Sequence, residues 1–83
     1  MAATMPHLRT YRVELHQDPG STGWWVEVPA LPGCFTQGDT VALAMERVQE
    51  AISAYLASLA KHGEPIPPPD ADWPAVSVPE PRA

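Results

Sequence analysis

The chain has a single cysteine, Cys34, among its 83 residues. One cysteine cannot form a disulfide within the chain, so the disulfide framework that stabilises many small secreted domains is excluded. The sequence also lacks an apolar run of about 20 residues, and its first residues have neither a cationic start nor an apolar stretch. We therefore expect no helical membrane span and no signal peptide. These absences favour a soluble protein of the reducing cytoplasm.

Basic residues are scarce as well. Ten aspartates and glutamates against five lysines and arginines give a formal net charge of −5. An acidic chain without a basic stripe is repelled by phosphate backbones, which disfavours direct binding to DNA or RNA. The same charge suits a basic protein partner, because complementary potentials raise encounter rates and specificity.

Few residues offer the side chains of a metal or catalytic site. The three histidines, His7, His16 and His62, are scattered along the chain, so the sequence predicts no metal site and no cofactor. Cys34 follows a Pro-Gly pair and has no histidine near it in the sequence. A buried apolar role is therefore favoured over that of a nucleophile.

Carboxylates raise one enzymatic alternative, a divergent nuclease that uses two divalent ions. Glu14 and Glu27 can neighbour each other across a hairpin, but Glu46 and Glu50 fall on the outer face of the predicted helix. No aspartate occupies a core position of a predicted strand. Solvated surface carboxylates are favoured, and the sequence predicts a binding protein rather than an enzyme.

A chain of 83 residues has room for one domain. Residues 9–79 are predicted to form it, with residues 1–8 and 80–83 as flexible tails. So short a domain buries only about 60% of the surface of its unfolded chain. Its core is thin, and a homodimer or higher homo-oligomer is the expected supplement.

The first half of the chain predicts a three-stranded antiparallel meander. Apolar and polar residues alternate over residues 11–16, as in a half-buried strand. Turn-forming residues 18–23 separate this strand from a second β-rich run at 24–28. Residues 29–33 contain two prolines that stop the second strand, and residues 34–37 predict a brief third one.

One long helix is predicted between Thr40 and His62. Asp39 and Thr40 favour its N-cap, and Gly63 favours a left-handed C-cap. Apolar residues recur at steps of three and four through this segment, which is the period of an amphipathic helix. They are Val41, Met45, Val48, Ile52, Tyr55 and Leu59, and Ala44, Ala51 and Leu56 widen the stripe.

The end of the chain predicts an extended connector and a short edge strand. Residues 64–70 are rich in proline and cannot be helical. Residues 75–78 favour a strand, and prolines on both sides restrict it to a sheet edge. If this strand pairs parallel to the first, the helix covers one face of a four-stranded sheet as a right-handed crossover. The predicted fold class is α+β.

Two adjacent tryptophans in one strand cannot both face a core covered by a single helix. Trp24 shares the core phase, so Trp25 is expected on the open side, with Phe35 beside it and Glu14 and Glu27 around it. Aromatic anchors rimmed by charge are typical of binding hot spots. The patch is alternatively covered by a homodimer, or by the proline-rich segment with Trp73.

Residues 24–40 resemble the signature of HicB-like antitoxins, in which a strand ending in Val-Pro leads through a Leu-Pro-Gly-Cys turn and a Thr-x-Gly-Asp-Thr turn into one helix. Residues 63–67 resemble the segment that follows the helix in that family. The signature residues are Pro29, Leu31, Pro32, Gly33, Cys34, Gly38, Asp39 and Thr40.

The resemblance implies a truncated RNase H-like fold and a partner, a small basic HicA-type toxin that cleaves mRNA. Many members of the family carry a C-terminal DNA-binding module, whereas this sequence ends about five residues after its last predicted strand. We therefore expect the module, and operator binding by this chain, to be absent. The main alternative is a stand-alone oligomeric domain of the same fold that binds or regulates without a toxin.

Overall fold

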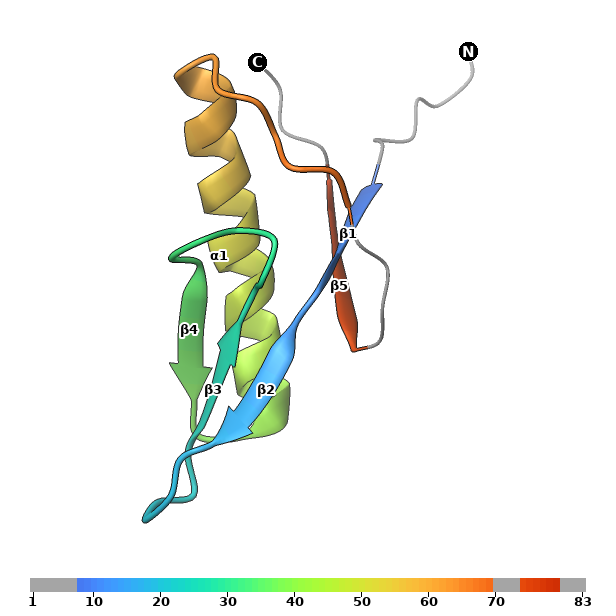
Figure 1. Ribbon diagram of the computed structural model, residues 1–83. Coiled ribbons are helices and arrows are strands. Elements are labelled where there is room, and N and C mark those ends of the chain that lie inside the picture. The colour runs from blue at the N-terminus through green and yellow to red at the C-terminus, as the bar shows by residue number, and fades with distance from the viewer. Residues whose placement is uncertain (1–7, 70–73, 80–83) are drawn as a thin grey trace.

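The structure is a computed structural model that describes residues 8–69 and 74–79. A helix lies along the strands, and the last strand lies beside the first (Figure 1). The α+β class predicted from the sequence is confirmed. In chain order the elements are β1 (Leu8–Arg12), β2 (Glu14–Gln17), β3 (Trp24–Glu27), β4 (Phe35–Gly38), α1 (Val41–Lys61) and β5 (Ala75–Pro79).

The predicted meander consists of β2, β3 and β4, which pair antiparallel in that order. The strand predicted at residues 11–16 is interrupted at Val13. The backbone N–H of Val13 donates to the carbonyl of Pro74 at 2.9 Å, so this residue lies between two ladders. As a result β1 and β2 belong to separate sheets, and β1 pairs with β5.

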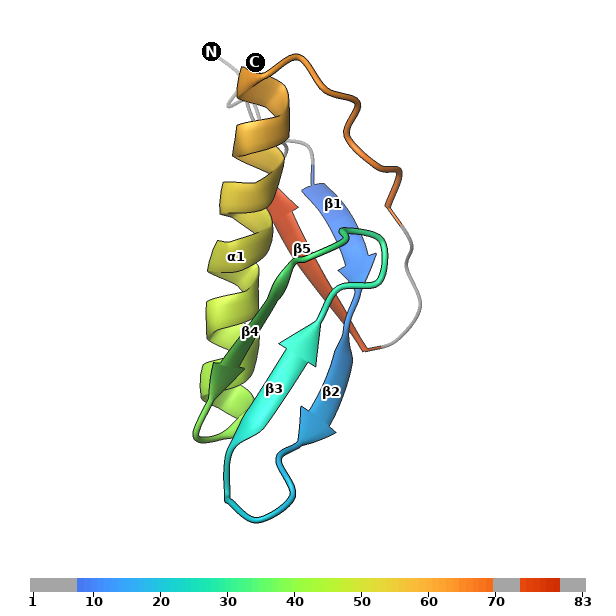
Figure 2. The same cartoon turned by 60° about the vertical axis from the view of Figure 1, so that its left-hand side comes forward.

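A parallel pairing of the last strand with the first is wrong. β5 runs antiparallel to β1, with Tyr11 opposite Val76, and the described strands form a two-stranded and a three-stranded sheet instead of one sheet of four. The connector explains the direction. It runs back from the end of α1 toward the other end of the molecule (Figure 2), and it is fixed to β1 where the hydroxyl of Tyr11 donates to the carbonyl of Pro67 at 2.7 Å.

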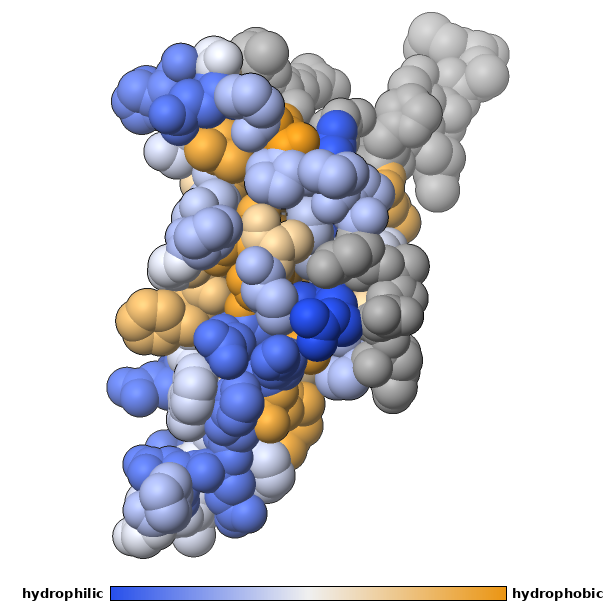
Figure 3. Space-filling view, viewed as in Figure 1, coloured by the Kyte–Doolittle hydropathy of each residue, from blue (hydrophilic) through white to orange (hydrophobic). Residues whose placement is uncertain are grey.

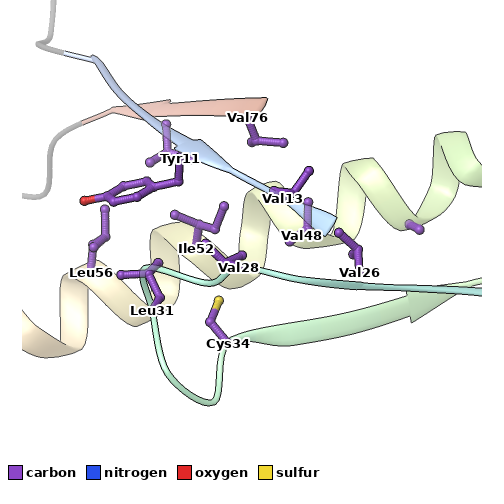
Figure 4. Close-up of a cluster of buried hydrophobic side chains, with 12 residues drawn as sticks. Tyr11, Val13, Val26, Val28, Leu31, Cys34, Val48, Ile52, Leu56 and Val76 are labelled. Carbon is purple, nitrogen blue, oxygen red and sulfur yellow. The ribbon is translucent and has the colours of Figure 1, made fainter. Parts of the chain in front are cut away.

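The hydrophobic core lies between α1 and the strands (Figure 4). Residues from every region of the described chain meet there, and Leu15 and Trp24 pack against its border. The strand phases predicted from the sequence are confirmed, since Tyr11, Val13, Val26 and Val28 are buried. The full set of buried hydrophobic residues is Tyr11, Val13, Val26, Val28, Leu31, Cys34, Ala44, Val48, Ile52, Leu56, Val76 and Val78.

The helix begins and ends where the sequence predicts. The hydroxyl of Thr40 accepts a hydrogen bond from the backbone N–H of Leu43 at 3.1 Å, and Gly63 has a φ of +67°. The buried line runs through Ala44, Val48, Ile52 and Leu56, all of which belong to the predicted stripe. Val41, at the start of that stripe, is 39% exposed. No helix among the described residues is long and apolar enough to cross a bilayer.

Gly38 brings β4 against the first turn of α1. A Cβ built on Gly38 would lie 2.7 Å from the backbone nitrogen of Ala44 and 3.0 Å from the carbonyl carbon of Leu43. These are backbone atoms, which a rotamer change cannot move. Glycine is therefore needed here for the close approach of strand and helix.

We expect Gly38→Ala to lower the free energy of unfolding by about 1–3 kcal/mol, because the added methyl group overpacks the contact between β4 and α1. Chemical denaturation monitored by circular dichroism measures the change. Gly23→Ala is the control, since its Cβ would meet the mobile side-chain oxygen of Ser21 at 3.2 Å and no closer backbone. Equal stability of the Gly38→Ala and wild-type chains would contradict this account.

Candidate functional site

The side of the three-stranded sheet that faces away from α1 is the candidate functional site. Alternation along β3 directs Trp25 and Glu27 to this side, while Val26 is buried beneath them. Residues paired in register with these two on the neighbouring strands share the same side. We call this surface the open face, and its residues are Glu14, His16, Trp25, Glu27, Phe35 and Gln37.

Two aromatic side chains of the open face are exposed. Trp25 is 37% exposed and Phe35 is 67% exposed, and together with Glu27 and Gln37 they line a shallow depression of about 530 Å³. Aromatic residues are enriched at interfaces between proteins. The expected position of Trp25 and Phe35 on the uncovered side agrees with this geometry.

The other half of the open face is polar. Glu14 lies opposite Glu27 across the hairpin, as the sequence predicts. His16 lies opposite Trp25, and their rings stack with centroids 4.1 Å apart and an angle of 17° between the planes. Its Nε2 is 3.1 Å from Oε1 of Glu27, and Arg12 forms an ion pair with Glu14 at 3.4 Å.

The scattered positions of the histidines in the sequence do not indicate that His16 lies beside the carboxylates of Glu14 and Glu27. The signal lies in the strand period, because Glu14 and His16 are two residues apart and therefore share a face. The hairpin register then brings Glu27 to the same place.

Figure 3, in the orientation of Figure 1, shows that hydrophilic residues predominate over the lower strands, with separate hydrophobic groups among them.

One alternative cover for the aromatic patch was the proline-rich segment with Trp73. Trp73 lies outside the described residues, as do the predicted tails apart from Leu8, which is the first residue of β1. The described part of the connector runs along β1, where the guanidinium of Arg9 and the hydroxyl of Tyr11 both donate to the carbonyl of Pro67.

The turn between β3 and β4 is built by its own backbone. The N–H of Leu31 donates to the carbonyl of Val28 at 3.0 Å, and the N–H of Cys34 donates to the carbonyl of Leu31 at 2.9 Å. The side chains of Leu31 and Cys34 enter the core, while Gly33 takes a φ of +82° that other residues rarely adopt. The hydroxyl of Tyr55 holds the turn on α1 by donating to the carbonyl of Pro32 at 2.9 Å.

The residues singled out in the sequence thus fall into three groups. One group stabilises the turn, the core and the helix cap, and consists of Leu31, Gly33, Cys34, Gly38 and Thr40. The four residues expected to contact a partner share the open face. Pro29, Pro32 and Asp39 are exposed.

Cys34 is buried, as predicted. Burial raises the pKa of its thiol above the ordinary value of 9.0, because desolvation disfavours the charged thiolate. The thiolate is the nucleophilic form, so this environment does not favour covalent catalysis at Cys34.

A two-ion nuclease site is not formed within residues 8–69 and 74–79. Glu46 and Glu50 are exposed on α1, away from the hairpin carboxylates. In this part of the chain, one group of at least three metal-type side chains comes together, and it consists of Glu14, His16 and Glu27.

A family model matches residues 11–79, and it describes the HicB-like antitoxin of bacterial toxin-antitoxin systems. A UPF0150 protein of Thermoplasma acidophilum is 57% identical over 47 residues, which cover 57% of this chain and 68% of that protein. A UPF0150 protein of Synechocystis is 34% identical over 70 residues, which cover 84% of this chain and 87% of that protein.

Two solved structures are similar in fold. The N-terminal domain of the Burkholderia pseudomallei antitoxin HicB superposes with a TM-score of 0.66 at 24% identity, over 83% of this chain and 92% of that domain. The Burkholderia pseudomallei antitoxin HicB gives the same TM-score at 25% identity, over 83% of this chain and 59% of that protein. The present chain therefore matches the amino-terminal part of that antitoxin.

Replacing Trp24 or Trp25 by alanine is expected to lower the free energy of unfolding by different amounts. Trp24 borders the core, so Trp24→Ala should lower the free energy of unfolding by about 2 kcal/mol or more, given that removal of a core aromatic costs about 3–5 kcal/mol. Trp25→Ala loses the exposed stack on His16 and should cost about 1 kcal/mol or less. Urea denaturation measures both, and a larger loss for Trp25→Ala would contradict the assignment of faces.

The buried thiol should make stability depend on pH at the alkaline end. Because the pKa of Cys34 is raised in the folded chain, the unfolded chain loses its thiol proton first. Stability should therefore fall as pH rises above about 9.0 toward the folded pKa. Cys34→Ala serves as the reference that removes the thiol's contribution to this slope. An identical pH dependence for the two chains would contradict the predicted effect.

Proposed function

The chain belongs to the HicB-like antitoxin family, and from this membership we propose that it is an antitoxin that binds and neutralises a small, basic HicA-type toxin, an mRNA-cleaving ribonuclease of the cytoplasm. Neutralisation is by binding, with no turnover by this chain. The toxin docks on the open face and its active site is obstructed. The observation that carries this proposal is the exposure of Trp25 and Phe35 on a sheet face with two carboxylates.

The aromatic half of the open face supports the proposal through its buried area on binding. A large aromatic side chain at the centre of an interface commonly carries much of the binding free energy. Trp25 is also preorganised, because its ring is held against His16. A preorganised anchor loses less conformational entropy when a partner docks.

Charge supports the same partner class. The net charge of −5 and the placement of Glu14 and Glu27 on the open face give a surface that attracts a basic protein. Electrostatic attraction between exposed charges weakens with salt. The proposed complex should therefore associate more slowly as ionic strength rises, while the aromatic contacts govern dissociation.

We expect Trp25→Ala and Phe35→Ala each to weaken toxin binding by about 30-fold or more, or about 2 kcal/mol, since both remove an anchor of the interface. Calorimetry with the purified HicA-type partner gives the affinity, and an RNA-cleavage assay reports neutralisation. Val41→Ala is the control, because Val41 is 39% exposed, close to the 37% of Trp25, but lies at the start of α1. Wild-type affinity in both aromatic variants would exclude the open face as the docking surface.

The alternative function, a stand-alone oligomeric domain without a toxin, predicts a different result for the same variants. Exposed aromatic residues on a small domain also suit a homodimer. If Trp25→Ala changes the mass of the chain in solution by light scattering, and no basic partner co-purifies with the wild-type chain, the open face joins two copies of this chain. An unchanged mass together with lost toxin affinity supports the antitoxin.

A further inference from the structure

The polar half of the open face brings three metal-ligating side chains together. Glu14 and His16 are two residues apart on β2, and Glu27 lies opposite Glu14 on β3. One ligand atom from each of the three lies within 4.8 Å of the others. We infer that Glu14, His16 and Glu27 form a binding site for one divalent transition-metal ion of the Zn²⁺ class. The inference is independent of the proposed function, because it concerns the isolated chain.

The geometry is near that of a zinc site. Zinc binds imidazole nitrogen and carboxylate oxygen at about 2.0–2.2 Å, and tetrahedral ligands then lie about 3.3 Å from one another. Nε2 of His16 and Oε1 of Glu27 are already 3.1 Å apart. The remaining separations close by rotation of the glutamate side chains, which stand on a half-exposed surface.

His16 has a fixed orientation. Its ring is stacked on Trp25 at 4.1 Å, and this contact leaves Nε2 directed at the carboxylate of Glu27. A ligand held by its neighbours loses little freedom when the ion binds, so the stack preorganises the nitrogen donor. Glu14 and Glu27 are the adaptable members of the site.

The negative charges of the site favour the binding of a cation. Two carboxylates directly opposite on paired strands repel each other. Arg12 forms an ion pair with Glu14 at 3.4 Å, and at this degree of exposure water screens both this pair and the repulsion between the carboxylates. A coordinated divalent ion lies between both carboxylates at bond distance and neutralises them together.

The donor set selects the type of ion. Mg²⁺ and Ca²⁺ are bound by oxygen ligands in sixfold or higher coordination, whereas imidazole suits Zn²⁺, Cu²⁺, Ni²⁺ and Fe²⁺. Three protein ligands on an exposed face leave a further position for water. The site takes a single ion, which distinguishes it from the two-ion centre of a nuclease.

Titration of Zn²⁺ into the full chain, without an affinity tag and freed of metal by a chelator, tests the site by calorimetry. We expect one ion per chain, and affinity at least tenfold lower in His16→Gln and in Glu27→Gln. His62→Gln and Glu46→Gln are the matched controls, since His62 and Glu46 are exposed on and after α1. Both should bind Zn²⁺ as the wild-type chain does.

A second readout does not depend on variants. Imidazole resonances in a nitrogen-15 correlation spectrum should shift for His16 and not for His62 when Zn²⁺ is added, and Mg²⁺ at the same concentration should cause no such shift. The inference would be overturned if the wild-type chain showed no saturable binding of Zn²⁺. It would also be overturned if His16→Gln bound Zn²⁺ as strongly as the wild-type chain. An equal response to Mg²⁺ would overturn the assigned class of ion.

Discussion

The packing of α1 against the three-stranded sheet governs the rest of this structure, because one helix can cover only one face of a sheet. Strand residues alternate between the two faces, so half of them must lie on the side that the helix leaves bare. On the covered side the alternation supplies valines and Leu15 to the core. On the bare side it places Glu14, His16, Trp25, Glu27 and Phe35. The open face is thus the direct consequence of this arrangement of layers.

The turn between β3 and β4 and the residues that follow it set how the helix approaches the sheet. Leu31 and Cys34 anchor this turn in the core, Gly38 allows the backbone of β4 to touch the first turn of α1, and Thr40 caps the helix. The signature residues that reveal the family are therefore mostly residues that build the fold. The open face, where the proposed toxin would dock, lies on the other side of the sheet.

The open face contains two kinds of side chain next to each other, an aromatic group and a group of carboxylates with an imidazole. Trp25 connects them, because its ring borders the depression beside Phe35 and also stacks on His16. The aromatic half carries the proposed anchors for a protein partner, and the carboxylate and imidazole half forms the inferred cation site. Both halves depend on the register of the hairpin between β2 and β3, which sets His16 opposite Trp25 and Glu14 opposite Glu27.

The sequence alone determined the local structure, because its signals are local. Strand alternation predicted which of Trp24 and Trp25 faces the core, and the period of three and four residues with Thr40 and Gly63 at the ends predicted the helix. The tertiary structure decided the rest. Strand direction depended on how far the connector runs back along β1, the break at Val13 depended on a bond to Pro74, and the grouping of His16 with two glutamates depended on pairing between strands. Each of these involves residues brought together only by folding.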